Sequence, residues 1–224
     1  MDDTTKMVAL LRRLKTEMNG AVVGAMQERG VDYPLSYGVS VATIREIAAD
    51  YAPDHSLALL LFRQQVRELR LAAAFIDDPA RVTPQQMDEW AEAFDRAEIV
   101  EQVVWALFRR VKHTARTSLS WMGADRPMKR YAGLLTAASS LDEEWCGGDP
   151  EAFLEAVGRI GEEGNLPAAV RRGIVRLLLR LSGTSAGMLR KTKELLAEYA
   201  ASGDASLRDV AEEAGWQIEY AQDE

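Results

Sequence analysis

Residues 99–111 read IVEQVVWALFRRV, and this stretch decides the fold class. Its apolar residues recur at intervals of three and four, which places them on one face of an α-helix. They are Ile99, Val100, Val103, Val104, Leu107, Phe108 and Val111. Similar spacing recurs along the chain on both sides, and no segment shows the strict alternation of a half-buried strand. We therefore expect an all-α protein of about a dozen helices.

The breaks between these helices are regular. All seven prolines lie where a helix would begin or end. The sequence Thr83-Pro84-Gln85-Gln86 is typical of a capping box with proline at the first helical position. Short connections favour a superhelix of stacked antiparallel helix pairs, and a plain bundle remains the alternative because no fixed-period repeat is visible. We expect a single domain over residues 1–224, in which Gly30 to Ser40 form an ordered loop.

Composition indicates the cytoplasm. Cys146 is the only cysteine, so no disulfide framework can form within the chain. No apolar run approaches the roughly 20 residues that span a bilayer, and the acidic start lacks the order of a signal peptide. The two histidines, His55 and His113, cannot complete a familiar zinc site with Cys146. We therefore expect no membrane association, no metal and no cofactor.

Positive charge is concentrated in two stretches of a chain whose net charge is −8. Residues 103–135 contain seven basic residues against one acidic, and residues 166–193 contain seven against none. Arg172, Arg176 and Arg180 recur every four residues, which predicts one charged stripe along a helix. One such stripe is typical of a solvated face, but two in successive helix pairs would meet on one concave surface and attract phosphates. The candidate DNA contacts are Arg109, Arg110, Lys112, Arg126, Lys129, Arg130, Arg171, Arg172 and Arg176.

Other chemical signals are weaker. Residues 183–187, GTSAG, match the nucleophile elbow of a hydrolase, but helical sequence precedes them and both histidines lie upstream of Ser185. Ser185 fits the N-cap of the next helix better. Trp90 and Trp105 fall in apolar stripes and are expected in the core. Trp121 either packs in the core or contacts a base.

A series of motifs runs through the first 135 residues. They are Tyr37-Gly38-Val39-Ser40, Ile44-Arg45-Glu46-Ile47-Ala48, Asp54-His55-Ser56-Leu57-Ala58, Arg67-Glu68-Leu69-Arg70-Leu71-Ala72, Ile76-Asp77-Asp78-Pro79, Met87-Asp88-Glu89-Trp90 and Arg130-Tyr131-Ala132-Gly133. In order and spacing, residues 35 to about 135 resemble the DNA alkylation repair family, the AlkD-like glycosylases. The resemblance implies an α-α superhelix of HEAT-like, armadillo-type helix pairs. The C-terminal third matches only as a helical pattern.

The resemblance also implies an activity, the removal of alkylated purines such as 3-methyladenine and 7-methylguanine from DNA without base flipping. In the family, an aspartate stabilises the sugar cation as the glycosidic bond breaks. Two tryptophans pack beside the deoxyribose, and arginines hold the phosphates. A cationic base is already a good leaving group, so one carboxylate near the developing charge supplies much of the remaining stabilisation.

The match changes at the residues that would carry this chemistry. The family's aspartate aligns with Glu101, its first tryptophan with Ala97, and its second tryptophan near Arg176. Glu101 keeps the carboxylate on a longer side chain, Ala97 offers no aromatic face, and an arginine repels a cationic base while it attracts phosphate. Glu98 is an alternative carboxylate, and both glutamates also fit salt-bridge partners on a basic face. Three functions stay open: a DNA glycosylase with Glu101 as the catalytic residue, a non-catalytic DNA-binding protein, and a helical scaffold for a protein partner.

Overall fold

The computed structural model describes residues 2–112, 114–142 and 147–223. Within these ranges the structure has thirteen α-helices, one 3-10 helix and no strand, which confirms the all-α fold. No helix in this part of the chain is both long and apolar enough to cross a bilayer. His113, the acidic pair Glu143 and Glu144, Trp145 and Cys146 lie outside the described residues.

The helices belong to two compact units, whose boundaries lie within α6 and α7. Unit 1 consists of Met1–Trp90 and Trp105–Arg110. It holds α1 (Asp3–Thr16), α2 (Gly20–Glu28), α3 (Val41–Ala49), α4 (His55–Phe62), α5 (Arg67–Ile76), most of α6 (Pro84–Glu92) and the 3-10 helix η1 (Phe108–Arg110).

Unit 2 consists of Ala91–Val104 and Val111–Glu224. It holds most of α7 (Ala97–Ala106), α8 (Ala115–Met122), α9 (Pro127–Ser140), α10 (Pro150–Glu163), α11 (Ala168–Ser182), α12 (Ala186–Ala200) and α13 (Ala205–Asp223). The expectation of a single domain stays a prediction.

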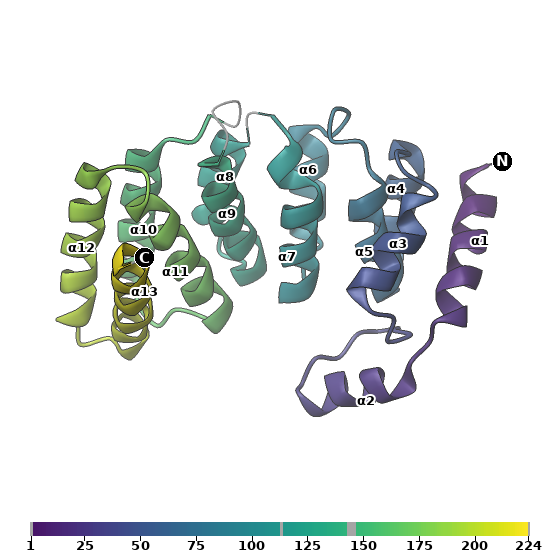
Figure 1. Ribbon diagram of the computed structural model, residues 1–224, viewed down its shortest axis with the longest axis horizontal. Helices are drawn as coiled ribbons and strands as arrows, with labels where there is room; N and C mark the ends of the chain where they lie inside the picture. The colour runs from purple at the N-terminus through teal and green to yellow at the C-terminus, as the bar shows by residue number, and fades with distance from the viewer. Residues whose placement is uncertain (1, 113, 143–146, 224) are drawn as a thin grey trace. The chain divides into compact units, whose positions relative to one another are not determined.

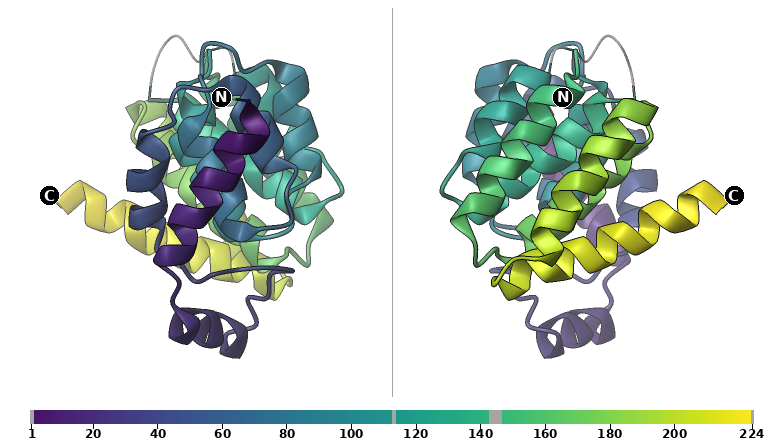
Figure 2. Two further views of the ribbon diagram at one scale, coloured as in Figure 1. Left: turned by 90° about the vertical axis from the view of Figure 1, so that its right-hand side faces the viewer. Right: turned by 90° about the vertical axis from the view of Figure 1, so that its left-hand side faces the viewer.

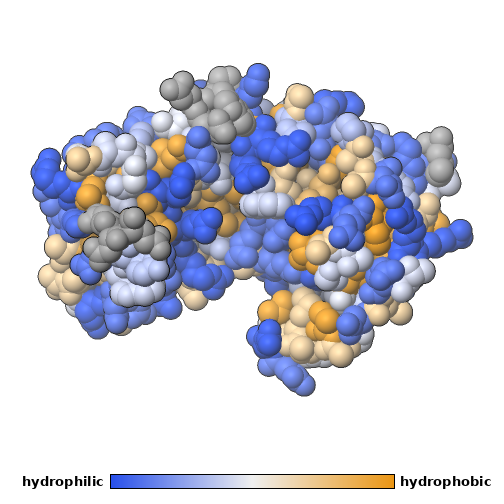
Figure 3. Space-filling view, in the orientation of Figure 1, coloured by the Kyte–Doolittle hydropathy of each residue, from blue (hydrophilic) through white to orange (hydrophobic). Residues whose placement is uncertain are grey.

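Unit 1 is built around α5, which packs against α3 and α4 while α1 packs against α4. Nine of the ten residues of α5 are buried, including Glu68, whose carboxylate holds the preceding loop in place. Glu68 Oε1 accepts hydrogen bonds from Ser36 Oγ and the backbone N–H groups of Tyr37 and Val39. The expected loop from Gly30 to Ser40 is thus ordered by contacts with α5. By contrast, α2 has no buried residue, stands apart from the other helices of unit 1, and presents apolar surface (Figures 1 and 3).

Unit 2 consists of two rows of helices. In one row α11 lies between α9 and α13, and in the other α10 contacts α8 and α12 (Figure 1). Across the rows, α8 packs on α9 and α12 packs on α13. Phe153, Leu134, Val170 and Leu177 are fully buried in the core that these helices share. Burying each such side chain contributes about 1.5–3 kcal/mol. The C-terminal end of α13 projects beyond the other helices of unit 2 (Figure 2).

The predicted helix starts are confirmed. Ser185 Oγ accepts a hydrogen bond from Met188 N at 3.1 Å, so Ser185 is the N-cap of α12 and not a nucleophile. Thr83 Oγ1 likewise accepts from Gln86 N at 3.1 Å. The capping box is only half formed, because the amide of Gln86 instead donates to the buried carboxylate of Asp77. Asp77 also bonds His55 Nδ1 at 2.7 Å, and the His55 side chain is 14% exposed.

The stretch 99–111 forms two elements instead of one helix. The α-helix α7 ends at Ala106, and the 3-10 helix η1 follows from Phe108 to Arg110. The apolar stripe continues through this break, because Leu107, Phe108 and Val111 all remain buried. Trp90 is in the core as predicted, stacked on Phe62 with the ring centroids 3.9 Å apart.

Candidate nucleic-acid interface

Three side chains from the alternate helices α7, α9 and α11 meet in unit 2. The hydroxyl of Tyr131 on α9 donates a hydrogen bond to Glu101 Oε1 on α7 at 2.7 Å. The guanidinium of Arg172 on α11 lies over the Tyr131 ring, with its central carbon 5.7 Å from the ring centroid. We call Glu101, Tyr131 and Arg172 the polar cluster. The cluster brings together a carboxylate from α7, a phenol from α9 and a guanidinium from α11.

Close packing of α9 and α11 positions this cluster. Gly173 follows Arg172, and a Cβ at this glycine would lie within 3.0 Å of Tyr131 and Leu134. Only glycine therefore allows α11 to approach α9 this closely. Glu101 is half-buried, whereas Tyr131 is 4% exposed. The carboxylate is thus reachable from solvent, and the phenol that binds it is held in the core.

The surroundings of Tyr131 keep its hydroxyl protonated. Burial and, after it, the hydrogen bond to the Glu101 carboxylate together raise the pKa of Tyr131 to about 12. Arg172 opposes both effects, because a guanidinium favours the phenolate. At neutral pH Tyr131 is therefore a donor, and one oxygen of Glu101 is occupied by it.

Arg172 and Arg176 form the part of this face that is available to a ligand. They are four residues apart on α11, so they project from the same side of the helix, and both are exposed. Within the described ranges neither guanidinium has a carboxylate at salt-bridge distance, and that of Arg172 lies against the Tyr131 side chain. The third member of the stripe, Arg180, is paired with Asp142.

Most other candidate DNA contacts of unit 2 are paired within the protein. Glu92 binds both Lys129, at 2.5 Å, and Arg126, at 3.0 Å, and these two cations hold the pKa of its carboxyl below the usual value. Arg171 lies 3.5 Å from Asp209 on α13. Arg126 and Arg171 are exposed enough for a phosphate to replace the carboxylate at small cost, whereas the Lys129 side chain is only 13% exposed.

Arg130 is a different case. Its side chain is 9% exposed and donates from Nη1 to Glu163 at 2.6 Å and from Nε to the backbone oxygen of Ala124 at 2.9 Å. A guanidinium held in this way must break both contacts to reach a phosphate. In the structure this side chain joins α9 to α10, and its role as a phosphate contact stays a prediction.

The remaining candidates are spread over both units. Lys112 is exposed in unit 2, and Glu98 is half-buried in the first turn of α7. Arg109 and Arg110 are exposed residues of η1 in unit 1. Their role in DNA binding stays a prediction, and so does the catalytic role of Glu101. The same holds for the expected absence of a metal, although no group of three or more potential ligand residues is found among the described residues.

Two aromatic expectations are decided by burial. Trp121 is 1% exposed, so it packs in the core and cannot contact a base. Trp105 was expected in the core, and this is wrong: the side chain is 46% exposed and lies between Arg45 and Arg109. Trp105 is adjacent in sequence to the buried Val104 and two residues before the buried Leu107, which favoured a core position. On the helix, however, its side chain lies at the edge of the apolar stripe. Charged neighbours from another helix, which the spacing does not reveal, surround it instead.

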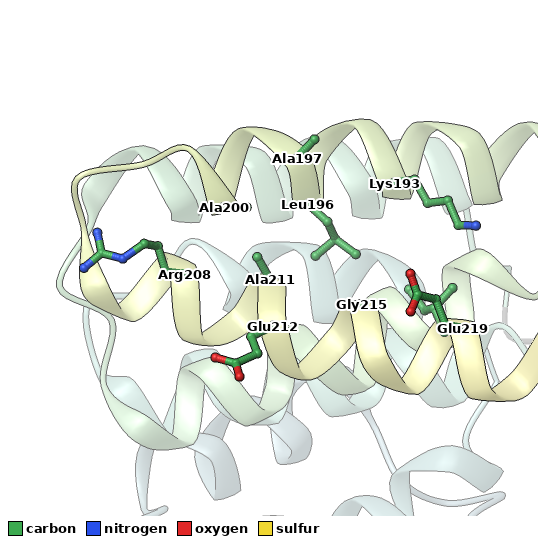
Figure 4. A pocket seen from close by; sticks show the side chains of 10 residues that line it. Lys193, Leu196, Ala197, Ala200, Arg208, Ala211, Glu212, Gly215 and Glu219 are labelled. Carbon is green, nitrogen blue, oxygen red and sulfur yellow. The ribbon is translucent and has the colours of Figure 1, made fainter.

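Unit 2 also has a groove between α12 and α13, with a volume of about 390 Å³ (Figure 4). Leu196 of α12 and Ala211 of α13 point toward one another across its floor, and Glu212 and Glu219 lie along α13 (Figure 4). The lining is mixed in charge, with Lys193 and Arg208 as well as the two glutamates, and the exposed arginines of α11 lie outside it. The groove is therefore not part of the candidate phosphate-binding face.

Comparison with known proteins gives a family and a fold. The family model described as DNA alkylation repair enzyme matches residues 10–163. A solved structure described as a new family of proteins related to the HEAT-like repeat DNA glycosylases, with affinity for branched DNA structures, superposes with a TM-score of 0.74. It is 15% identical in sequence, over 99% of this chain and 95% of that chain. A designed armadillo repeat protein matches at a TM-score of 0.40 and 10% identity, over 80% and 92% of the two chains. No curated protein sequence matches the chain. The HEAT-like helical-repeat fold is thus confirmed.

Proposed function

Because this chain belongs to the DNA alkylation repair family, we propose that it binds DNA through the phosphate backbone, with Arg172 and Arg176 as the main contacts. The observation that carries the proposal is the pair of exposed guanidiniums, one turn apart on α11, that lack a carboxylate partner among the described residues. Guanidinium groups bind phosphate oxygens in bidentate geometry, and arginines one turn apart suit neighbouring phosphates.

The polar cluster supports a positioning role for Glu101 within this interface. Glu101 holds the hydroxyl of Tyr131, and the Tyr131 ring supports the guanidinium of Arg172. A stacked guanidinium loses less conformational freedom when it binds a phosphate. The relative with affinity for branched DNA structures lends support to branched DNA as one ligand form.

Charge reversal on α11 tests the proposal. The double variant Arg172→Glu/Arg176→Glu should weaken the binding of duplex and four-way-junction DNA by at least about tenfold at low salt, because it replaces attraction to phosphate by repulsion. The matched control is Arg159→Glu/Arg190→Glu, which makes the same change in net charge at exposed arginines of α10 and α12 that are already paired with glutamates. Fluorescence anisotropy with labelled DNA measures both.

Two results contradict the proposal. If both double variants weaken binding equally, net charge and not the α11 face determines affinity. If the wild-type protein has no affinity for either DNA at low salt, a protein partner becomes the better hypothesis.

Excision of alkylated purines is the second candidate function. The observation in its favour is that Glu101 is half-buried rather than sealed in the core, so its carboxylate can be approached from solvent. Against it, Ala97 supplies no aromatic surface, and the guanidinium beside Tyr131 disfavours a cationic base.

Product release decides between the two functions. A glycosylase releases 3-methyladenine or 7-methylguanine from alkylated duplex DNA, and Glu101→Gln should abolish the release while DNA affinity remains. A binding protein releases no more base than a buffer control. Equal release by the wild-type protein and Glu101→Gln would remove Glu101 from the chemistry.

A further inference from the structure

Unit 1 exposes an indole between two guanidiniums. The side chain of Trp105 is 46% exposed at the end of α7. The central carbon of the Arg109 guanidinium lies 5.1 Å from the Trp105 ring centroid, and that of Arg45 lies 6.0 Å from it. An exposed indole beside two guanidiniums combines a flat apolar surface with positive charge.

In unit 1, α3, η1 and the last residues of α7 bring these side chains together. Arg45 projects from the exposed side of α3, whose opposite side buries Ile44, Ile47 and Ala48. Arg109 follows the buried Phe108 in η1. Because each element is anchored by its buried residues, the core fixes the backbone positions from which both arginines reach the indole.

The two charges near Trp105 are uncompensated. Within the described ranges neither Arg45 nor Arg109 has a carboxylate at salt-bridge distance, whereas the nearby Arg13 of unit 1 is paired with Asp50 at 2.7 Å. Cation–π contact with an indole holds a guanidinium in place without neutralising its charge. The site therefore attracts an anion with an apolar or aromatic part.

Nucleic acid with unpaired bases matches both features. Phosphates satisfy the guanidiniums, and a base has a flat π-face for the indole, whose contact with a base is sequence-tolerant. Blunt duplex DNA offers the phosphates alone, because its bases are stacked on one another. An acidic peptide would satisfy the arginines and leave the indole exposed.

We propose that Arg45, Trp105 and Arg109 form a subsite for unpaired nucleotides, with the guanidiniums on phosphates and the indole against a base. The inference rests on the proposed function in that DNA is the ligand. It concerns residues of unit 1 alone, so it can fail while the phosphate contacts of α11 stand.

Comparison of single-stranded with blunt duplex DNA tests the subsite. The probes are a labelled oligonucleotide of mixed sequence and the same strand annealed to its complement. Trp105→Ala should weaken binding of the single strand by about tenfold, the loss expected when one base loses its aromatic partner, and leave duplex binding within about twofold. Trp105→Phe should keep most of the affinity, because it preserves a π-face. Circular dichroism establishes that the variants are folded.

Charge variants complete the design. Arg45→Ala and Arg109→Ala should each weaken binding of the single strand and reduce its salt dependence, by about 0.7 in the slope for each lost phosphate contact. Arg12→Ala, at an exposed arginine of α1, is the control and should change neither quantity. Titration with single-stranded DNA should also quench more indole emission in the wild-type protein than in Trp105→Phe.

Two outcomes overturn the subsite. One is unchanged single-strand affinity of Trp105→Ala in a protein whose duplex binding does fall with Arg172→Glu/Arg176→Glu, which leaves the proposed function standing. The other is polyglutamate binding that is as tight as single-stranded DNA and equally dependent on Trp105, which removes base recognition. Absence of all DNA binding at low salt instead overturns the proposed function, and this subsite with it.

Discussion

At the scale of single residues, the contact between Glu101 and Tyr131 bears on the predicted catalytic role of Glu101. The phenol occupies one carboxylate oxygen, and Arg172 lies over the same ring. In such surroundings the negative charge of Glu101 is partly satisfied before any ligand arrives, so less of it remains to stabilise a sugar cation. The same contacts fix the direction of Arg172, which suits phosphate binding.

The raised pKa of Tyr131 leads to a pH prediction. In the unfolded chain a tyrosine ionises near pH 10, and in the folded protein Tyr131 does so at about 12. Its contribution to stability is therefore fully present below pH 10 and is lost between about pH 10 and 12, because there only the unfolded state releases the proton. By pH 11 the loss amounts to about 1 kcal/mol.

Urea unfolding at pH 9 and pH 11 measures this effect. The loss of unfolding free energy between the two pH values should be smaller by about 1 kcal/mol in Tyr131→Phe than in the wild-type protein. Tyr220→Phe, at an exposed tyrosine of α13, is the control and should lose as much as the wild type. Equal losses in all three proteins would show that Tyr131 has no raised pKa.

Some of these residues could be found from the sequence and others could not. Glu101 was identified by resemblance, and the stripe of Arg172 and Arg176 by its spacing of four. The contact of Tyr131 with Glu101 depends on how α9 packs against α7, which no local pattern specifies. Trp105 was misplaced for the same reason, because it is exposed beside Arg45 of α3, and the pairing of Arg130 with Glu163 across two helices is equally invisible to local patterns.

At the scale of the helix, close approach between neighbours is achieved with glycine. A Cβ at Gly133 of α9 would lie 2.7 Å from the backbone nitrogen of Met122 and 2.9 Å from the backbone oxygen of Ser118 in α8. Backbone atoms cannot move aside as a flexible side chain can. The distance between α8 and α9 is therefore set by the absence of a side chain at this residue.

Alanine at Gly133 should push the two helices apart. We expect Gly133→Ala to lower the free energy of unfolding by about 1–3 kcal/mol, as overpacking does. The control is Gly158→Ala in α10, where a Cβ would meet nothing within 4 Å. There the higher helix propensity of alanine should raise stability by about 0.5–1 kcal/mol. Denaturant unfolding of both variants measures the difference, and a stable Gly133→Ala would refute the close approach.

Helices were the most predictable level of the structure. The spacing of apolar residues predicted the helices. Thr83, Ser185 and the prolines predicted where helices begin, because these signals act within one turn of the chain. The break between α7 and η1 was missed, since Leu107, Phe108 and Val111 stay buried on both sides of it. The spacing of apolar residues predicts which residues are buried. A 3-10 turn at this point keeps the same residues buried, so the spacing does not reveal the change of helix type.

At the scale of the whole molecule, a chain with a net charge of −8 is expected to bind a polyanion only through a local excess of positive charge. On α11 a local excess of positive charge remains, because Arg172 and Arg176 lack carboxylate partners within the described ranges. Around Glu92 the positive charge is neutralised in part, because this carboxylate pairs with both Arg126 and Lys129. The sequence counts charges along the chain, but only the fold shows which of them remain uncompensated.

The salt dependence of DNA affinity tests this account most directly. Each phosphate contact contributes about 0.9 to the slope of log K against log salt concentration on duplex DNA. Arg172→Ala/Arg176→Ala should therefore reduce the magnitude of the slope by about two, while Arg159→Ala/Arg190→Ala leaves it unchanged. A slope that is the same in the wild-type protein and in the Arg172→Ala/Arg176→Ala variant would contradict phosphate binding by this face of α11.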